Sequence, residues 1–214
     1  RSFVFQYTQK SLTKLDLATL EYIPLLAKEL ALISEDGLAY TYELRDGITW
    51  DDGTPLTAKD IEFSTKVMLC PLTNNAQIRS NYSSVIKSVE IDKDNPLKFT
   101  MYAHDVNYTN SNIFSELYIQ QKNYWDPEGV LDKLSFKDIF AAKFKETKEL
   151  TDWFNSYNDG DNSYKPHLLQ GLGAYQVTEW VAGQYITIEK KENWWGVNDT
   201  SIYSSAFPDR IIFK

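Results

Sequence analysis

Few residues of this chain have types and spacing that could support chemistry. Asp51 and Asp52 are the closest pair of carboxylates, and paired carboxylates can serve as general acid and base. Asp52 precedes Gly53, however, and the Asp-Gly dipeptide is typical of tight turns. We therefore interpret this segment as a turn, and hydrolysis by an unrecognised carboxylate pair is only our third hypothesis.

Metal ligands and nucleophiles are equally sparse. His104 and His167 are far apart in the sequence and lack the ligand spacing of a zinc site. The run 159–162 resembles the start of a calcium loop, but the glycine at the sixth position is missing and Gln170 replaces the glutamate at the twelfth. Cys70 stands in an apolar stretch, where a buried structural thiol is expected. We predict no enzyme, no catalytic residue, no metal and no cofactor.

The aromatic residues near the C-terminal end allow two interpretations. Trp180, Tyr185, Trp194 and Trp195 could form a platform on which a sugar or a peptide stacks. Alternatively they fill the core between hairpin and helices, because a half-buried strand buries one face by default. We favour the core, and a carbohydrate-binding module using exposed aromatics is the alternative function.

Composition sets broad limits on fold and partners. The chain has 214 residues, of which 43% are hydrophobic, so it can bury a substantial core. Its formal net charge is -8, so it lacks the excess of Lys and Arg that is typical of a nucleic-acid binder. We therefore expect no nucleic-acid partner. A single cysteine excludes an internal disulfide. No run approaches the ~18 apolar residues that a membrane span requires.

Several elements can be read from the first half of the sequence. Residues 38–44 alternate between apolar and polar, which predicts a half-buried strand. Thr57 as N-cap and Asp60 three residues later predict the start of a helix that ends before Pro71. Two strands, 85–92 and 97–102, flank a turn and form a hairpin. Pro24 fits the first turn of a short helix.

The second half continues this mixture of helices and hairpins. Ser135 and Asp138 mark another helix start, and an irregular apolar stripe runs on to Phe154. Residues 175–180 and 185–190 alternate as two strands, and a last strand lies within 210–214. We predict an α/β (mixed α+β) fold with at least one mixed sheet.

The order of five segments resembles one protein family. The segments are Glu35–Asp60 (EDGLAYTYELRDGITWDDGTPLTAKD), Asn95–Thr100, Gly171–Tyr185, Asn193–Gly196 (NWWG) and Pro208–Phe213. In this order and spacing the chain resembles the family 5 extracellular solute-binding proteins, the peptide- and nickel-binding type that serves ABC importers.

The resemblance implies the domain organisation. We expect a lobe of the periplasmic binding protein-like class II fold, with a mixed sheet and an inserted smaller subdomain. Residues 1–15 and 166–214 would be parts of domain I, and 16–165 would be the inserted domain II. Domain III would be absent, so we expect a fragment whose signal or lipoprotein sequence lies outside this chain.

The resemblance also implies the function. The chain would belong to the substrate-binding component of a bacterial ABC importer that captures a solute, most simply an oligopeptide, for a membrane permease. The protein would be a monomer, periplasmic or extracellular and membrane-anchored. The family often has Gly-Thr-Gly-Pro-Tyr near the cleft, where this chain has Gly171-Leu172-Gly173-Ala174-Tyr175. Gly173, Ala174 and Tyr175 are therefore the candidate ligand-binding residues, although Tyr175 also fits the core of a strand.

Overall fold

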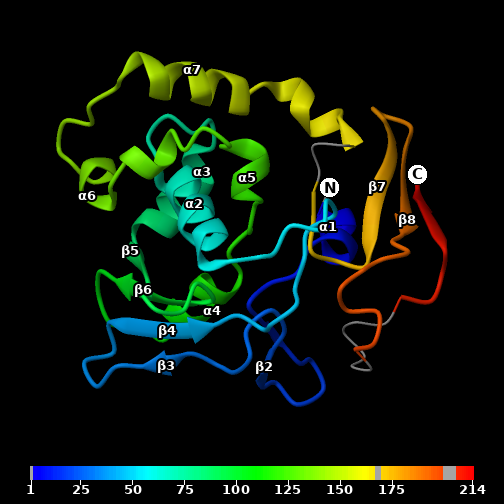
Figure 1. Ribbon diagram of the computed structural model, residues 1–214, viewed down its shortest axis with the longest axis horizontal. Coiled ribbons are helices and arrows are strands. Elements are labelled where there is room, and N and C mark those ends of the chain that lie inside the picture. The colour runs from blue at the N-terminus through cyan, green and yellow to red at the C-terminus, as the bar shows by residue number, and fades with distance from the viewer. Residues whose placement is uncertain (1, 167–169, 200–205) are drawn as a thin grey trace. The chain divides into compact units, whose positions relative to one another are not determined.

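A computed structural model describes residues 2–166, 170–199 and 206–214 (Figure 1). Contacts divide the chain into two compact units. The first unit comprises Arg1–Lys10, Gly47–Leu56 and Asp159–Lys214, and the second comprises Ser11–Asp46 and Thr57–Asn158. The assignment of residues to domains I and II of the family stays a prediction.

Short helices and strands alternate along the chain. The helices are α1 (Ser2–Thr8), α2 (Ala58–Leu69), α3 (Ala76–Ser83), α4 (Asn110–Ser115), α5 (Lys122–Trp125), α6 (Phe136–Ile139) and α7 (Lys148–Tyr157), with 3-10 turns η1 (Leu131–Lys133) and η2 (Gly160–Tyr164). The strands are β1 (Thr13–Leu15), β2 (Tyr22–Pro24), β3 (Leu32–Ile33), β4 (Ala39–Glu43), β5 (Ile86–Ile91), β6 (Lys98–Ala103), β7 (Tyr175–Val181), β8 (Tyr185–Lys190) and β9 (Arg210–Phe213).

The second unit is built around an antiparallel sheet with the strand order β3-β4-β6-β5. Its register places Tyr40 opposite Met101 and Tyr42 opposite Phe99, and all four side chains are buried. The alternating pattern that predicted these strands therefore marks the face that builds the core. The predicted strand at 38–44 and the predicted hairpin of 85–92 and 97–102 are confirmed, with slightly shorter bounds.

Helix α2 covers this sheet and contacts β5. Asp60 Oδ2 accepts the backbone N–H of Thr57 at 2.9 Å, so the predicted cap is present. Ile61, Phe63 and Val67 are buried, and the helix ends at Leu69, two residues before Pro71. The predicted helix start and helix end are both confirmed.

The Cys70 thiol should make the stability of the protein depend on alkaline pH. Cys70 is fully buried, and burial raises the pKa of its thiol from 9.0 to about 11. The unfolded chain therefore loses the thiol proton at a lower pH than the folded protein does. As pH rises from about 9 to 11, the free energy of unfolding falls by about 2–3 kcal/mol. We expect Cys70→Ala to remove this step when urea unfolding is measured from pH 8 to 11. Equal pH slopes in both proteins would contradict the assignment.

The structure corrects three expectations. Pro24 ends strand β2, which pairs with β1, so the short helix expected there is wrong; its neighbours Tyr22 and Ile23 are locked in a β ladder. The apolar stripe from Ser135 splits into α6 and α7. Every strand pairing among the described residues is antiparallel, whereas we expected a mixed sheet. Parallel pairing needs a long crossover, and most of these strands are joined by hairpin turns.

The first unit contains the antiparallel sheet β7-β8-β9, and α1 contacts β7 (Figure 1). The three strands predicted here are confirmed. A second core cluster joins α1, the sheet and the loop after β8, and its buried members are Val4, Ala174, Tyr175, Val177, Ile188 and Trp194. All three candidate ligand-binding positions thus lie in this unit.

Candidate functional site

The segment Gly171–Tyr175 is packed directly against the C-terminal end of α1. Gly173 donates its backbone N–H to Thr8 O at 2.9 Å. A Cβ placed on Gly173 would lie 2.2 Å from Tyr7 O, and one on Gly171 would lie 2.0 Å from Thr8 O. Backbone atoms cannot give way as flexible side chains do, so both positions require glycine.

Two tryptophans fix the carbonyl between these glycines. Leu172 O accepts the indole N–H of Trp194 at 3.0 Å and that of Trp195 at 2.9 Å. Trp194 is only 6% exposed, and Trp195 and Trp180 pack against the same core. The core interpretation of these aromatic residues is confirmed for Trp194, because its ring and its single donor are both occupied within the unit.

A partly buried ion pair holds the other side of this segment. Lys191 Nζ lies 2.5 Å from Asp51 Oδ1 and donates to Gly171 O at 2.7 Å. The Lys191 backbone N–H also donates to Ala174 O at 2.9 Å. Burial lowers the pKa of Lys191, against the opposing effect of the Asp51 carboxylate. From the sequence, Asp51 was considered only as a carboxylate next to Asp52 and Lys191 was not a candidate, since the separation of Asp51 and Lys191 along the chain gives no pattern.

Tyr175 begins β7 and faces the core. Its side chain is 3% exposed, its hydroxyl donates to Pro208 O at 2.8 Å, and its ring meets the edge of Tyr7 at a centroid distance of 5.9 Å. Ala174 and Gly173 are buried beside it. The structure therefore gives each of the three candidates a packing role, and their role in ligand binding stays a prediction.

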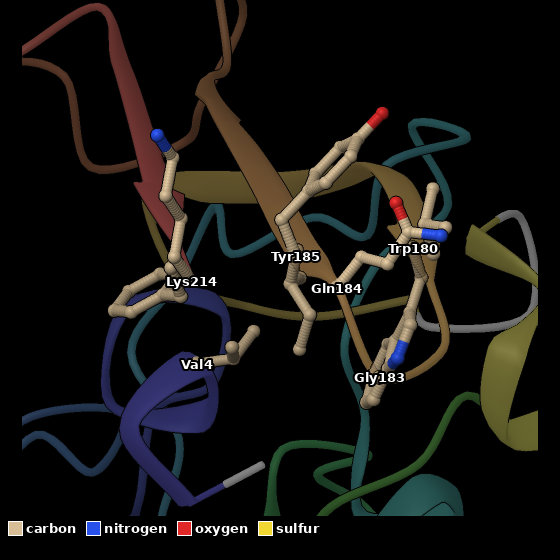
Figure 2. Close-up of a pocket in the computed structure, with 9 residues that line it drawn as sticks. Val4, Trp180, Gly183, Gln184, Tyr185 and Lys214 are labelled. Atoms are coloured by element: carbon tan, nitrogen blue, oxygen red, sulfur yellow. The ribbon is translucent and has the colours of Figure 1, made fainter.

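An apolar pocket of about 480 Å³ opens beside the β7–β8 hairpin. Val4 of α1 and three residues of the hairpin, Trp180, Gln184 and Tyr185, line it (Figure 2). Phe213 of β9 completes the lining. The alternation of residues along β7 and β8 predicted which side chains share a face of the hairpin. The sequence did not predict that α1 contacts β7.

A second, polar pocket of about 330 Å³ lies around the ion pair of Lys191 and Asp51. Asp51 and Lys191 line it together with Trp50, Asn193 and Trp195. Among the described residues, the buried indole N–H of Trp50 has no hydrogen-bond partner. The pocket combines fixed charges with amide and aromatic groups.

The remaining sequence candidates have structural roles in the described part of the chain. Asp52 Oδ1 accepts the backbone N–H of Thr54 at 2.9 Å in the predicted turn. His104 stacks edge-on against Phe140, and Asp159 caps η2 by accepting the N–H of Asp161 at 3.0 Å.

His167 lies outside the described residues, and so do two neighbouring positions. Across the described ranges, no group of three His, Cys, Asp or Glu side chains could hold a metal ion. In the same ranges, every helix is too short or too polar to cross a bilayer.

The whole chain aligns with a curated relative. It is 27% identical over 214 residues to the oligopeptide-binding protein AppA of Bacillus subtilis, covering 100% of this chain and 31% of that protein. It is also 27% identical over 163 residues to OppA of the same organism, covering 76% of this chain and 27% of the relative. The chain thus spans about a third of the length of the curated relatives that it matches.

Solved structures share the fold. NikZ from Campylobacter jejuni, solved in complex with Ni(L-His), superposes with a TM-score of 0.63 at 27% identity, covering 89% of this chain and 31% of that chain. The pheromone receptor PrgZ gives a TM-score of 0.68 at 17% identity, covering 99% of this chain and 38% of that chain, which supports the fold alone. The profile described as "Bacterial extracellular solute-binding proteins, family 5 Middle" matches residues 21–214. The chain therefore belongs to the family 5 bacterial extracellular solute-binding proteins.

Proposed function

We propose that this chain is part of the substrate-binding component of an ABC importer, and that the solute is an oligopeptide. The observation that carries the proposal is the alignment of all 214 residues with an oligopeptide-binding protein, within a family that binds solutes.

The same proposal defines partners and location. The protein acts outside the cytoplasm, is anchored to the membrane, works as a monomer without catalysing a reaction, and delivers its peptide to a permease. It is supported by the family and by further relatives named as peptide-binding, such as the dipeptide-binding protein DppE of Bacillus subtilis. The comparisons do not favour a carbohydrate-binding module.

Peptide binding can be tested on the chain itself. We expect tripeptides to nonapeptides to bind with a Kd on the order of 1 mM, because the chain supplies only part of the contact surface that longer relatives offer. Amide chemical shifts of isotope-labelled protein, followed during titration, measure the affinity and locate the responding residues.

Matched ligands distinguish the rival functions. Mannohexaose and Ni(L-His) serve as comparison ligands, and neither is expected to move the amide signals. A response to the oligosaccharide alone would support the alternative carbohydrate-binding function. No response to any peptide, or micromolar binding by this chain alone, would contradict the proposal in its present form.

A further inference from the structure

Three segments of the chain match Asn-X-Ser/Thr, the acceptor pattern for N-linked glycans. They are Asn81-Tyr82-Ser83, Asn107-Tyr108-Thr109 and Asn198-Asp199-Thr200. The pattern is short enough to occur by chance, so the surroundings of each asparagine determine whether it can accept a glycan. Thr200 lies outside the described residues, which leaves the first two segments for comparison.

The segment at Asn107 lies in the exposed loop that joins β6 to α4. Tyr108 is 94% exposed and Val106 is 67% exposed, and Asn107 between them is exposed as well. The base of the loop is fixed, because the buried Asn110 donates an Nδ2 hydrogen to Asp105 O at 2.9 Å. The loop therefore presents the whole acceptor segment to an enzyme in solution without opening the core of the second unit.

The side-chain amide of Asn107 is polarised by the third residue of its own segment. Asn107 Oδ1 accepts the hydroxyl of Thr109 at 2.9 Å and the backbone N–H of Thr109 at 3.0 Å. Both donors stabilise negative charge on Oδ1, so the amide releases an Nδ2 proton more readily. The required hydroxyl at the third position is thus already bonded to the amide that would react.

The segment at Asn81 has the opposite surroundings. It forms the C-terminal end of α3, so its backbone is held in a helix. Tyr82 is half-buried, and burial raises the pKa of its hydroxyl. The Ser83 hydroxyl donates to Ser80 O at 3.4 Å, away from the Asn81 amide. An enzyme would have to unwind the end of α3 and withdraw Tyr82 before it could reach Asn81.

The two segments also differ in charge. The exposed Asp105 precedes Asn107 by two residues, whereas Arg79 takes that place before Asn81. A carboxylate at this position can form an ion pair with a cationic side chain of a transferase, and an arginine would repel the same side chain. Exposure, hydrogen bonding and charge therefore all favour Asn107 over Asn81.

We propose that Asn107 is an acceptor site for an N-linked oligosaccharide. The co-reactant is an oligosaccharide carried on a polyprenyl pyrophosphate, and an oligosaccharyltransferase catalyses the transfer. Asn107 Nδ2 forms a bond to the anomeric carbon of the sugar, and the bond from that carbon to the pyrophosphate oxygen breaks. The polyprenyl pyrophosphate leaves with the bonding electron pair, and a base of the transferase takes the Nδ2 proton.

This inference goes beyond solute binding. It rests on the proposed location outside the cytoplasm in one respect, since N-linked glycans are carried by secreted proteins. The acceptor loop belongs to the second unit, whereas the candidate ligand-binding residues Gly173, Ala174 and Tyr175 belong to the first. Glycan transfer and peptide binding are therefore measured independently of each other.

Glycan transfer can be tested on the purified, folded chain. The probe is a bacterial oligosaccharyltransferase with its polyprenyl-pyrophosphate-linked oligosaccharide, and peptide mapping by mass spectrometry gives the occupancy of each asparagine. We expect transfer to Asn107, with an occupancy at Asn81 at least about tenfold lower because α3 must open first. A synthetic peptide of residues 103–111 serves as the unstructured reference and should be modified as well. Absence of transfer to Asn107 in the folded chain, whether or not the peptide is modified, would overturn the proposal.

Matched variants test the role of each group in the loop. Asn107→Gln keeps an amide and should abolish transfer to this loop, whereas Asn81→Gln should leave it unchanged. Thr109→Ala should lower the occupancy at least about tenfold, and Thr109→Ser should restore most of it because the donor to Oδ1 returns. Asp105→Asn should lower it less. The unfolding temperature of each variant shows that the fold is retained. Equal occupancy in Thr109→Ala and the parent chain would refute the assigned role of the hydroxyl, and equal occupancy at Asn81 and Asn107 would refute selection by the structure.

Discussion

Gly173→Ala should be among the most damaging single substitutions in the first unit. The added Cβ would lie 2.2 Å from Tyr7 O and 2.7 Å from Thr8 C, so α1 must move away from β7 or the hydrogen bond to Thr8 must break. We expect a loss of about 3 kcal/mol or more in the free energy of unfolding of this unit. Urea titration, with hydrogen exchange of β7 and β8 as the readout, measures it.

A second glycine provides the control for this prediction. Gly160 begins η2 in the same unit, and a Cβ there would meet no atom of the described part of the chain within 4 Å. Gly160→Ala should therefore change stability by less than about 0.5 kcal/mol. If the two alanine variants were equally stable, the close approach of the Gly171–Tyr175 segment to α1 would not exist in solution.

The contrast between these glycines shows what the sequence can indicate. The residues next to Gly160 and Gly173 in the sequence do not distinguish the two positions. Gly173 cannot be replaced because the backbone of α1 lies directly next to it. Local rules were sufficient for Tyr40 and Tyr42 on one strand face, for Asp60 at a helix start, and for the β7–β8 hairpin. Each of these depends on residues close together in the chain, where periodicity, capping and tight turns act.

The parts that could not be predicted depend on distant pairs. Nothing in the turn around Asp51 indicates a partner at Lys191, and nothing places Gly47–Leu56 in the first unit while its flanks belong to the second. Tyr175 illustrates the limit for the candidate site. The resemblance places it near a cleft, whereas its environment within the unit is that of a core residue bonded to Pro208 O. The family resemblance therefore indicates where Tyr175 lies in a complete solute-binding protein, whereas its packing shows what it contacts within this unit.

Among substitutions of helix-capping residues in the second unit, Asp60→Ala should reduce stability the most. The Asp60 carboxylate is 5% exposed and accepts two backbone N–H groups, from Thr57 at 2.9 Å and from Lys122 at 2.8 Å. The sequence predicted a helix start at Thr57 and Asp60 but neither of these bonds, and the second bond joins α2 to the start of α5. Alanine leaves both partly buried donors without the carboxylate, so we expect a loss of about 2–5 kcal/mol. Urea unfolding of the whole chain, with exchange in α2 as the local readout, measures this loss.

Asp138 offers a matched comparison because it caps α6 in the same way. Its carboxylate accepts the backbone N–H of Ser135 at 3.2 Å, but the side chain is exposed and water can replace it. Asp138→Ala should therefore reduce stability much less than Asp60→Ala. Asp60→Asn should fall between the two alanine variants, because the amide keeps one acceptor oxygen for either Thr57 or Lys122. Equal losses at Asp60 and Asp138 would mean that the bond to Lys122 contributes nothing, and α5 would then need another source of its position beside α2.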